Sequence, residues 1–230
     1  MHQLDDASFV TRNDPKEMYR LTAEFPLQCR TALDIARNAD LNADGMKPDV
    51  VILTGLGGSA AGGDFTKALF DDQGSTPFIV NRDYHLPKWV NARTLVFCAS
   101  YSGNTEETLT AYEDAKHSGC MIVAITSGGK LADKAVADGF PVVRIPGGQP
   151  PRTALGFLMI PTIVVCERLG LIPPQNYDQA FAGLDACVTQ WGVDNPFHYN
   201  VTKKLAEALH GKLSVIYGLG SWQAIVANRW

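Results

Sequence analysis

From Asp49 onward, short apolar runs rich in β-branched residues alternate with segments of helical periodicity, which leaves few folds open to the chain. The runs are apolar almost throughout, as is typical of strands covered by helices on both faces. The alternation predicts an α/β fold with a doubly wound, five-stranded parallel sheet flanked by helices. The expected strands are 50–55, 77–82, 94–100, 121–127 and 141–146, and the expected helices are 60–70, 105–117, 130–138 and 152–169.

The flanking sequence divides the chain into three regions. Residues 15–37 predict a helix packed on the outside, and 38–48 a polar linker, so that 1–48 form an N-terminal segment before a domain at 49–170. Two prolines in 170–174 break the chain. Residues 171–230 predict two helices, 177–191 and 197–210, and then a strand, glycine turn and helix that echo residues 50–65. We therefore expect the beginning of a second, similar domain that stops before its sheet is complete.

Composition excludes several partners. The net charge is −4, and no basic block is present to bind nucleic acid. The longest nearly uncharged apolar stretch, 154–166, is shorter than the roughly 20 residues of a membrane span. The polar, acidic N-terminus lacks the order of a secretory signal. These features predict a cytoplasmic protein with no membrane and no nucleic-acid partner.

Cysteine and histidine spacing gives no sign of a metal centre. The five cysteines form no CxxC pair and lie mostly in apolar runs, which predicts buried, reduced thiols. The five histidines lack the spacing that places two imidazoles on one ion. No metal is assigned.

The run GLGGSAAGGDF, residues 55–65, follows a predicted strand and opens a predicted helix. Backbone amides at such a position face an anion, and glycines allow it to approach closely. The run also satisfies the dinucleotide fingerprint G-x-G-x-x-A, but the first acid after the second strand, Asp83, comes too late to hold a ribose. An NADP site that uses Arg82, and a turn needed only for packing, remain alternatives.

The run SYSGNTEETL, residues 100–109, ends the third predicted strand and places three hydroxyls before a helix, those of Ser100, Ser102 and Thr105. A helix N-terminus carries about half a positive charge, and hydroxyls and amides can donate to every oxygen of a phosphate. Helix capping explains Thr105 but not the two serines. Because ligands gather at the carboxyl ends of parallel strands, the run predicts a phosphomonoester site.

Together with ITSGGKL (125–131) and PPRTALGF (150–157), these two motifs stand in an order that resembles the sugar isomerase (SIS) domain. The resemblance extends over about 49–230 and is strongest to the bifunctional phosphoglucose/phosphomannose isomerases. It implies that the sugar is lined by Gly57, Gly58 and Ser59, that the phosphate is held by Ser100, Ser102 and Thr105, and that Arg152 lies beside the reacting carbons.

The resemblance also implies the reaction: interconversion of glucose 6-phosphate and mannose 6-phosphate with fructose 6-phosphate through a cis-enediolate, by a homodimer that needs no cofactor. A guanidinium such as that of Arg152 can stabilise the developing oxyanion. The alternative for Arg152 is an arginine that is simply exposed to solvent.

In that family a glutamate base and a ring-opening histidine come from the second domain, the glutamate lying beyond the position of Trp230. We therefore expect this chain to bind its substrate without turnover. Glu106 and Glu107 are interpreted as charges of a first helical turn, and His198 and His210 as surface or core residues.

Two other functions stay open from the sequence. One is a sugar-phosphate-binding regulator, although residues 1–48 offer no pair of short helices suited to DNA. The other is an NADP-dependent dehydrogenase built on the glycine run.

Overall fold

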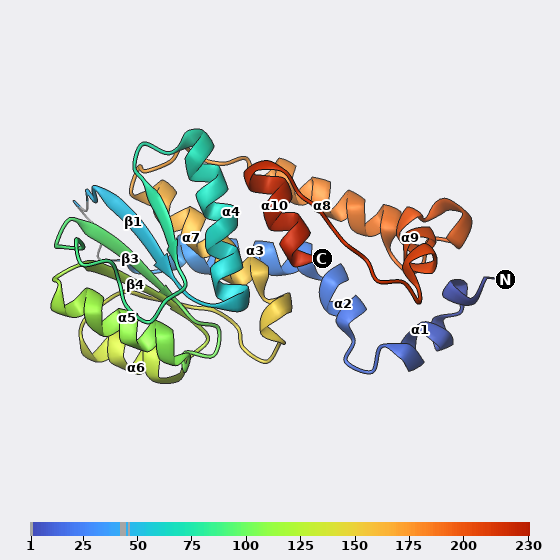
Figure 1. Cartoon of the computed structure of the whole chain (residues 1–230), viewed down its shortest axis with the longest axis horizontal. Helices are drawn as coiled ribbons and strands as arrows, with labels where there is room; N and C mark the ends of the chain where they lie inside the picture. The colour runs from blue at the N-terminus through green and yellow to red at the C-terminus, as the bar shows by residue number, and fades with distance from the viewer. Residues whose placement is uncertain (1, 42–44, 46) are drawn as a thin grey trace.

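The computed structural model describes residues 2–41, 45 and 47–230, and its centre is a five-stranded parallel sheet (Figure 1). The strands follow the order β2-β1-β3-β4-β5. The sheet is the one predicted, with each strand one to three residues shorter than expected. The strands are β1 (Val50–Thr54), β2 (Phe78–Asn81), β3 (Thr94–Ala99), β4 (Met121–Thr126) and β5 (Val142–Arg144).

Helices cover both faces of the sheet, as the continuous apolar runs require. Leu53 and Phe97 belong to a core that includes residues of α3 (Phe25–Asn38), α4 (Gly57–Gln73) and α7 (Leu155–Arg168). Ile52 and Val96, one position away, pack instead with α5 (Glu106–His117) and α6 (Gly129–Ala137). Alternate strand residues thus serve opposite layers, which Figure 1 shows on either side of the sheet.

The N-terminal segment differs from the single helix expected over 15–37. It contains a 3₁₀ turn (Gln3–Asp5), α1 (Ala7–Asn13), α2 (Met18–Ala23) and α3, with the break between α2 and α3 at Glu24. Pro26 lies in the first turn of α3, where its missing amide hydrogen costs no helical bond, and it therefore favours a new helix start there. The expected linker 38–48 lies partly outside the described residues.

The C-terminal region is helical where it was predicted to be, but its strand does not form. Helix α8 (Tyr177–Trp191) matches the prediction, and the expected helix 197–210 is a 3₁₀ turn (Phe197–Tyr199) followed by α9 (Val201–Leu209). Residues 213–219 are irregular, and Leu213 and Tyr217 are exposed. The prediction of a strand here was wrong for the described chain, because a strand requires a neighbour to pair its backbone groups.

Helix α10 (Gly220–Arg229) folds back against α4. The rings of Trp222 and Phe65 lie 6.2 Å apart between centroids. No described helix is long and apolar enough to cross a bilayer.

Four of the five cysteines are buried, as predicted, and none of the five is in a disulfide. Burial raises the pKa of the Cys29 thiol to about 12 and that of Cys120 to about 11. Cys187, on α8, is partly exposed.

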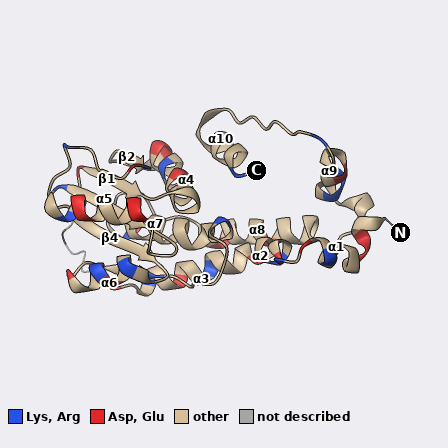
Figure 2. Cartoon of the chain, turned by 60° about the horizontal axis from the view of Figure 1, so that its bottom comes forward, with Lys and Arg blue, Asp and Glu red and all other residues tan. Residues whose placement is uncertain are grey.

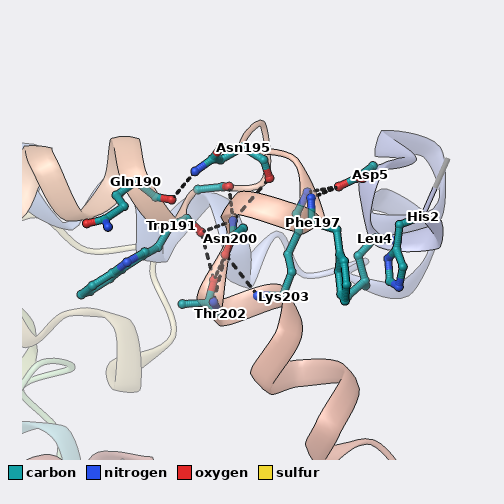
Figure 3. A network of polar contacts seen from close by, with 11 residues as sticks. His2, Leu4, Asp5, Gln190, Trp191, Asn195, Phe197, Asn200, Thr202 and Lys203 are labelled. Atoms are coloured by element: carbon teal, nitrogen blue, oxygen red, sulfur yellow. Dashed lines mark hydrogen bonds and ion pairs between the residues drawn. The ribbon is translucent and has the colours of Figure 1, made fainter.

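The N-terminal residues are fastened to α9 by an ion pair and to the turn before it by a ring stack, and we call these contacts the N-terminal clasp (Figure 3). The Asp5 carboxylate accepts hydrogen bonds from the Lys203 ammonium (2.7 Å) and from the Phe197 amide (2.9 Å). The ring of His2 stacks on that of Phe197 at 3.6 Å between centroids. Lys203 is only 7% exposed, so Asp5 is the acid that neutralises a nearly buried charge.

The clasp predicts an acid-sensitive contribution to stability. The hydrogen bond from Lys203 lowers the pKa of Asp5 below its ordinary value of 3.8. A carboxylate whose pKa is lower in the folded than in the unfolded protein stabilises the fold at pH values above its unfolded-state pKa. This stabilisation is lost as the pH falls through its folded-state pKa. We expect Asp5→Asn to lower the melting temperature near neutral pH, and this difference from the wild type to shrink progressively as the pH falls below 3.8.

The measurement is a series of thermal melts of both proteins between about pH 2 and pH 7. Asp133→Asn, on an exposed position of α6, is the matched control and should melt like the wild type throughout. A constant difference between Asp5→Asn and the wild type at all pH values would contradict the prediction.

Candidate functional site

The site lies where the turns after β1, β3 and β4, and the segment after β5, meet at the carboxyl edge of the sheet. Strands β1 and β3 are neighbours, with Thr54 opposite Cys98, so the glycine and serine motifs begin side by side. This is the edge at which parallel sheets bind ligands.

The glycine motif forms the first turn of α4, which begins at Gly57 and not at residue 60 as expected. No side chain caps this turn, whose N-cap residue is Leu56. Ser59 is buried at 6% exposure, whereas Gly57 is exposed. The backbone amides of a 17-residue helix thus begin at an open surface, which suits an anion or a sugar hydroxyl.

The serine motif places its three hydroxyls at different depths. Ser100 is only 1% exposed, and its Oγ lies 2.8 Å from Thr105 Oγ1 and accepts a hydrogen bond from the Gly103 amide at 3.1 Å. Ser102 is exposed, and its Oγ accepts from the Asn104 amide at 3.2 Å. Thr105 is the N-cap residue of α5, but its side chain makes no capping hydrogen bond. Helix capping therefore does not account for the Thr105 hydroxyl, which Ser100 holds in place from behind.

The ITSGGKL motif, in the turn after β4, supports the serine motif. Gly103 has φ +70°, and a Cβ there would lie 1.8 Å from the carbonyl oxygen of Gly128, in the turn after β4. The Leu131 amide donates to the Gly103 carbonyl at 2.9 Å, and the Lys130 amide to Asn104 Oδ1 at 3.1 Å. The turn of the serine motif, residues 100–105, is thus fixed against the ITSGGKL turn by backbone contact.

The PPRTALGF motif carries Arg152 on a 3₁₀ turn (Pro151–Thr153), and this arginine turn touches the glycine motif. A Cβ on Gly58 would lie 2.5 Å from the Pro151 carbonyl oxygen, so only glycine permits this approach. The arginine turn and the start of α4 are therefore in direct contact.

Arg152 is exposed, as its alternative interpretation required, but its guanidinium donates to the carbonyl oxygen of Arg229 on α10. Arg229 in turn donates to the carbonyl oxygen of Arg152 at 2.5 Å. Burial, and then the charge of Arg152, lower the pKa of Arg229. Two guanidinium groups thus adjoin at the site, and motif reasoning missed the second, since α10 lies far along the chain.

The other candidates lie elsewhere. Arg82, on which an NADP site would depend, forms an ion pair with Asp64 of α4. Glu106 and Glu107 are in the first turn of α5, as expected. His198 and His210 flank α9, near the N-terminal clasp.

Among the described residues no cluster of His, Cys, Asp or Glu could hold a metal ion. Figure 2 shows acidic and basic residues interspersed along the helices.

Tyr101 is a site residue that motif reasoning passed over. It is 7% exposed, and its hydroxyl accepts a hydrogen bond from the Gln149 amide at 3.0 Å, which joins the serine motif to the arginine segment. The available signal was an aromatic residue between two serines at a strand end, where a buried hydroxyl needs a partner.

Residues 47–138 match the SIS domain family. Solved structures show the same fold. A tagatose-6-phosphate ketose/aldose isomerase from Escherichia coli aligns with TM-score 0.61 and 22% identity over 76% of this chain and 53% of that one. A hypothetical protein from Thermus thermophilus aligns with TM-score 0.63 and 20% identity over 90% of this chain and 52% of that one.

Sequence similarity is greater to curated proteins named bifunctional phosphoglucose/phosphomannose isomerase, which confirms the resemblance seen in the motifs. The protein from Caldicellulosiruptor bescii is 42% identical over 215 residues, which cover 93% of this chain and 63% of that protein. The one from Thermoplasma acidophilum is 34% identical over 90% of this chain and 61% of its own length. The chain therefore spans somewhat over three fifths of these relatives.

Proposed function

We propose that the chain binds a hexose 6-phosphate as part of a phosphosugar aldose–ketose isomerase that interconverts glucose 6-phosphate and mannose 6-phosphate with fructose 6-phosphate. The observation that carries the proposal is the meeting of three motifs at one sheet edge: the Gly58 position abuts the Pro151 carbonyl of the arginine turn, and the Tyr101 hydroxyl of the serine motif accepts from the Gln149 amide just before that turn. The relatives that carry the name of this activity support it.

In this proposal the phosphate lies at the N-terminus of α5. The hydroxyls of Ser102 and Thr105 donate to its oxygens together with first-turn amides, and the helix dipole favours the dianion. Ser100 acts through Thr105, since its own hydroxyl is buried. The sugar extends from there towards Gly57, Gly58 and Ser59.

The carbonyl group moves between C1 and C2 when a base removes the proton on C2 and the same proton is delivered to C1. The intermediate is a cis-enediolate, whose oxyanion Arg152 would stabilise, and the reaction balances with proton transfers alone. We propose that the base, and the histidine that opens the pyranose ring, come from outside the turns described above. This chain by itself would then bind the sugar phosphate without turning it over.

Isothermal titration calorimetry with fructose 6-phosphate tests the proposal. We expect one site per chain, competition by inorganic phosphate, and no isomerisation in a coupled assay. NADPH, titrated by fluorescence, should not bind. Absence of fructose 6-phosphate binding would overturn the proposed site, tight NADPH binding would favour the dehydrogenase, and turnover at the rate of a full-length relative would overturn the assignment of the base.

The proposal also includes the oligomeric state of the enzyme and its location in the cell. The isomerase would act as a homodimer, which light scattering coupled to gel filtration would measure, and it would act in the cytoplasm, where hexose phosphates are found.

A further inference from the structure

Gln28 is a polar residue on the buried face of α3, and it is 4% exposed. It lies outside residues 47–138, which match the SIS family, and outside every motif discussed above. We infer that Gln28 is a positioning residue for Arg152, one that fixes the arginine turn relative to the phosphate turn. This inference rests on the proposed function of Arg152.

The Gln28 amide group binds the chain on both sides of Arg152. Its Nε2 donates to the side-chain oxygen of Gln149 and to the carbonyl oxygen of Thr153, both at 2.9 Å. Its Oε1 accepts from the amide of Gly156, in the first turn of α7, at 2.7 Å. One buried side chain thus holds the residues before and after the arginine turn.

The connection continues to the phosphate turn through Gln149. The backbone amide of Gln149 donates to the Tyr101 hydroxyl at 3.0 Å. The carbonyl oxygen of Tyr101 accepts from the Ser127 hydroxyl at 2.7 Å and from the Ser127 amide at 3.0 Å. Because Tyr101 stands between Ser100 and Ser102, a continuous chain of contacts runs from Gln28 to the phosphate motif.

Only a side-chain amide satisfies these partners. Two carbonyl oxygens face Nε2 and one N–H faces Oε1, so the position needs donors and an acceptor on the same planar group. A methionine of similar length would leave the Thr153 oxygen and the Gly156 amide without this partner, and a buried group left unpaired destabilises its segment. The arginine turn is the segment that would move.

The test compares two ligands in one protein. Inorganic phosphate probes the phosphate turn, and 5-phosphoarabinonate, whose carboxylate resembles the enediolate, probes Arg152 as well. We expect Gln28→Met to weaken the binding of 5-phosphoarabinonate by about tenfold or more, since small displacements of a site group cost that much. Its affinity for inorganic phosphate should stay within about twofold of the wild type, because the phosphate turn keeps its own contacts.

Tyr112→Phe is the control for a general loss of stability. It removes a buried hydroxyl that bonds to Asp138 at 2.6 Å, in the layer on the opposite face of the sheet. It should leave both affinities unchanged. Gln28→Glu, which keeps the acceptor and loses the donor, serves as a second variant and should repeat the selective loss. Hydrogen exchange of residues 149–156 should rise in both Gln28 variants and not in Tyr112→Phe.

Arg152→Ala separates this inference from the proposed function. Gln28→Met/Arg152→Ala should bind 5-phosphoarabinonate no more weakly than Arg152→Ala, because Gln28 acts through Arg152. If Arg152→Ala weakens the analogue and the Gln28 variants do not, or if they weaken both ligands equally, the positioning role is overturned and the proposed function stands. If the wild type fails to bind the analogue, or Arg152→Ala binds it normally, the proposed function falls and the inference with it.

Discussion

Gly103→Ala is expected to lower the free energy of unfolding by about 3–5 kcal/mol, the sum of a backbone cost and a packing cost. The residue has φ +70°, a conformation that side chains disfavour, and its Cβ would lie 1.8 Å from the Gly128 carbonyl oxygen. The Cβ position is fixed by the backbone of residue 103 and the oxygen belongs to the backbone of Gly128, so neither can rotate away. Differential scanning calorimetry should show a fall in melting temperature of roughly 10 °C or more.

Gly119→Ala measures the backbone cost alone, so its difference from Gly103→Ala gives the packing cost. Gly119 has φ +69°, nearly the same as Gly103, but no atom lies within 4 Å of its Cβ position. It should lose only about 1–2 kcal/mol, the cost of the backbone conformation. Equal losses in the two variants would show that the contact between the turns after β3 and β4 does not matter to stability.

The second large effect concerns the phosphate turn. We expect Ser102→Ala/Thr105→Val to weaken fructose 6-phosphate binding by about 100-fold or more, because a hydrogen bond to a charged group contributes about 1.5–3 kcal/mol and two are removed. Thr105→Val also removes the partner of Ser100, whose Oγ lies 2.8 Å from Thr105 Oγ1. Calorimetric titration measures the loss.

A matched variant removes the same atoms elsewhere on the same helix. Thr110→Val/Ser118→Ala changes a threonine in the middle of α5 and the serine at its C-cap, away from the phosphate turn. It should bind fructose 6-phosphate like the wild type. Wild-type affinity in the Ser102→Ala/Thr105→Val protein would place the phosphate elsewhere.

The central sheet could be predicted from sequence because its strands are buried on both faces and therefore read as unbroken apolar runs. The same reasoning failed at residues 213–217, since a β-branched run specifies a strand only where another strand pairs with it. Local sequence carries no information about that neighbour. The N-terminal clasp was likewise hidden, because Asp5 and Lys203 are far apart in the chain and neither belongs to a motif.

The site was predictable to the level of its turns and not to the roles of its side chains. Glycine and hydroxyl patterns located the turns after β1 and β3, but they gave Ser100 the same role as Ser102, whereas Ser100 is buried behind Thr105. Gln28 could have been suspected, because it is a polar residue on a helix face otherwise formed by Cys29, Ala32 and Ala36. Its three partners, however, depend on how α3 packs against α7.

The distribution of thiols gives the protein a ready attachment point for an optical probe. A maleimide dye reacts with accessible thiolates, and the buried thiols with raised pKa, such as those of Cys29 and Cys120, are shielded from it in the native state. Cys187, the partly exposed thiol of the five, lies in a groove that α8 shares with Phe25 and Pro26 of α3. A single dye would therefore label α8 selectively without prior mutagenesis and report changes where that helix meets α3, the helix that carries Gln28.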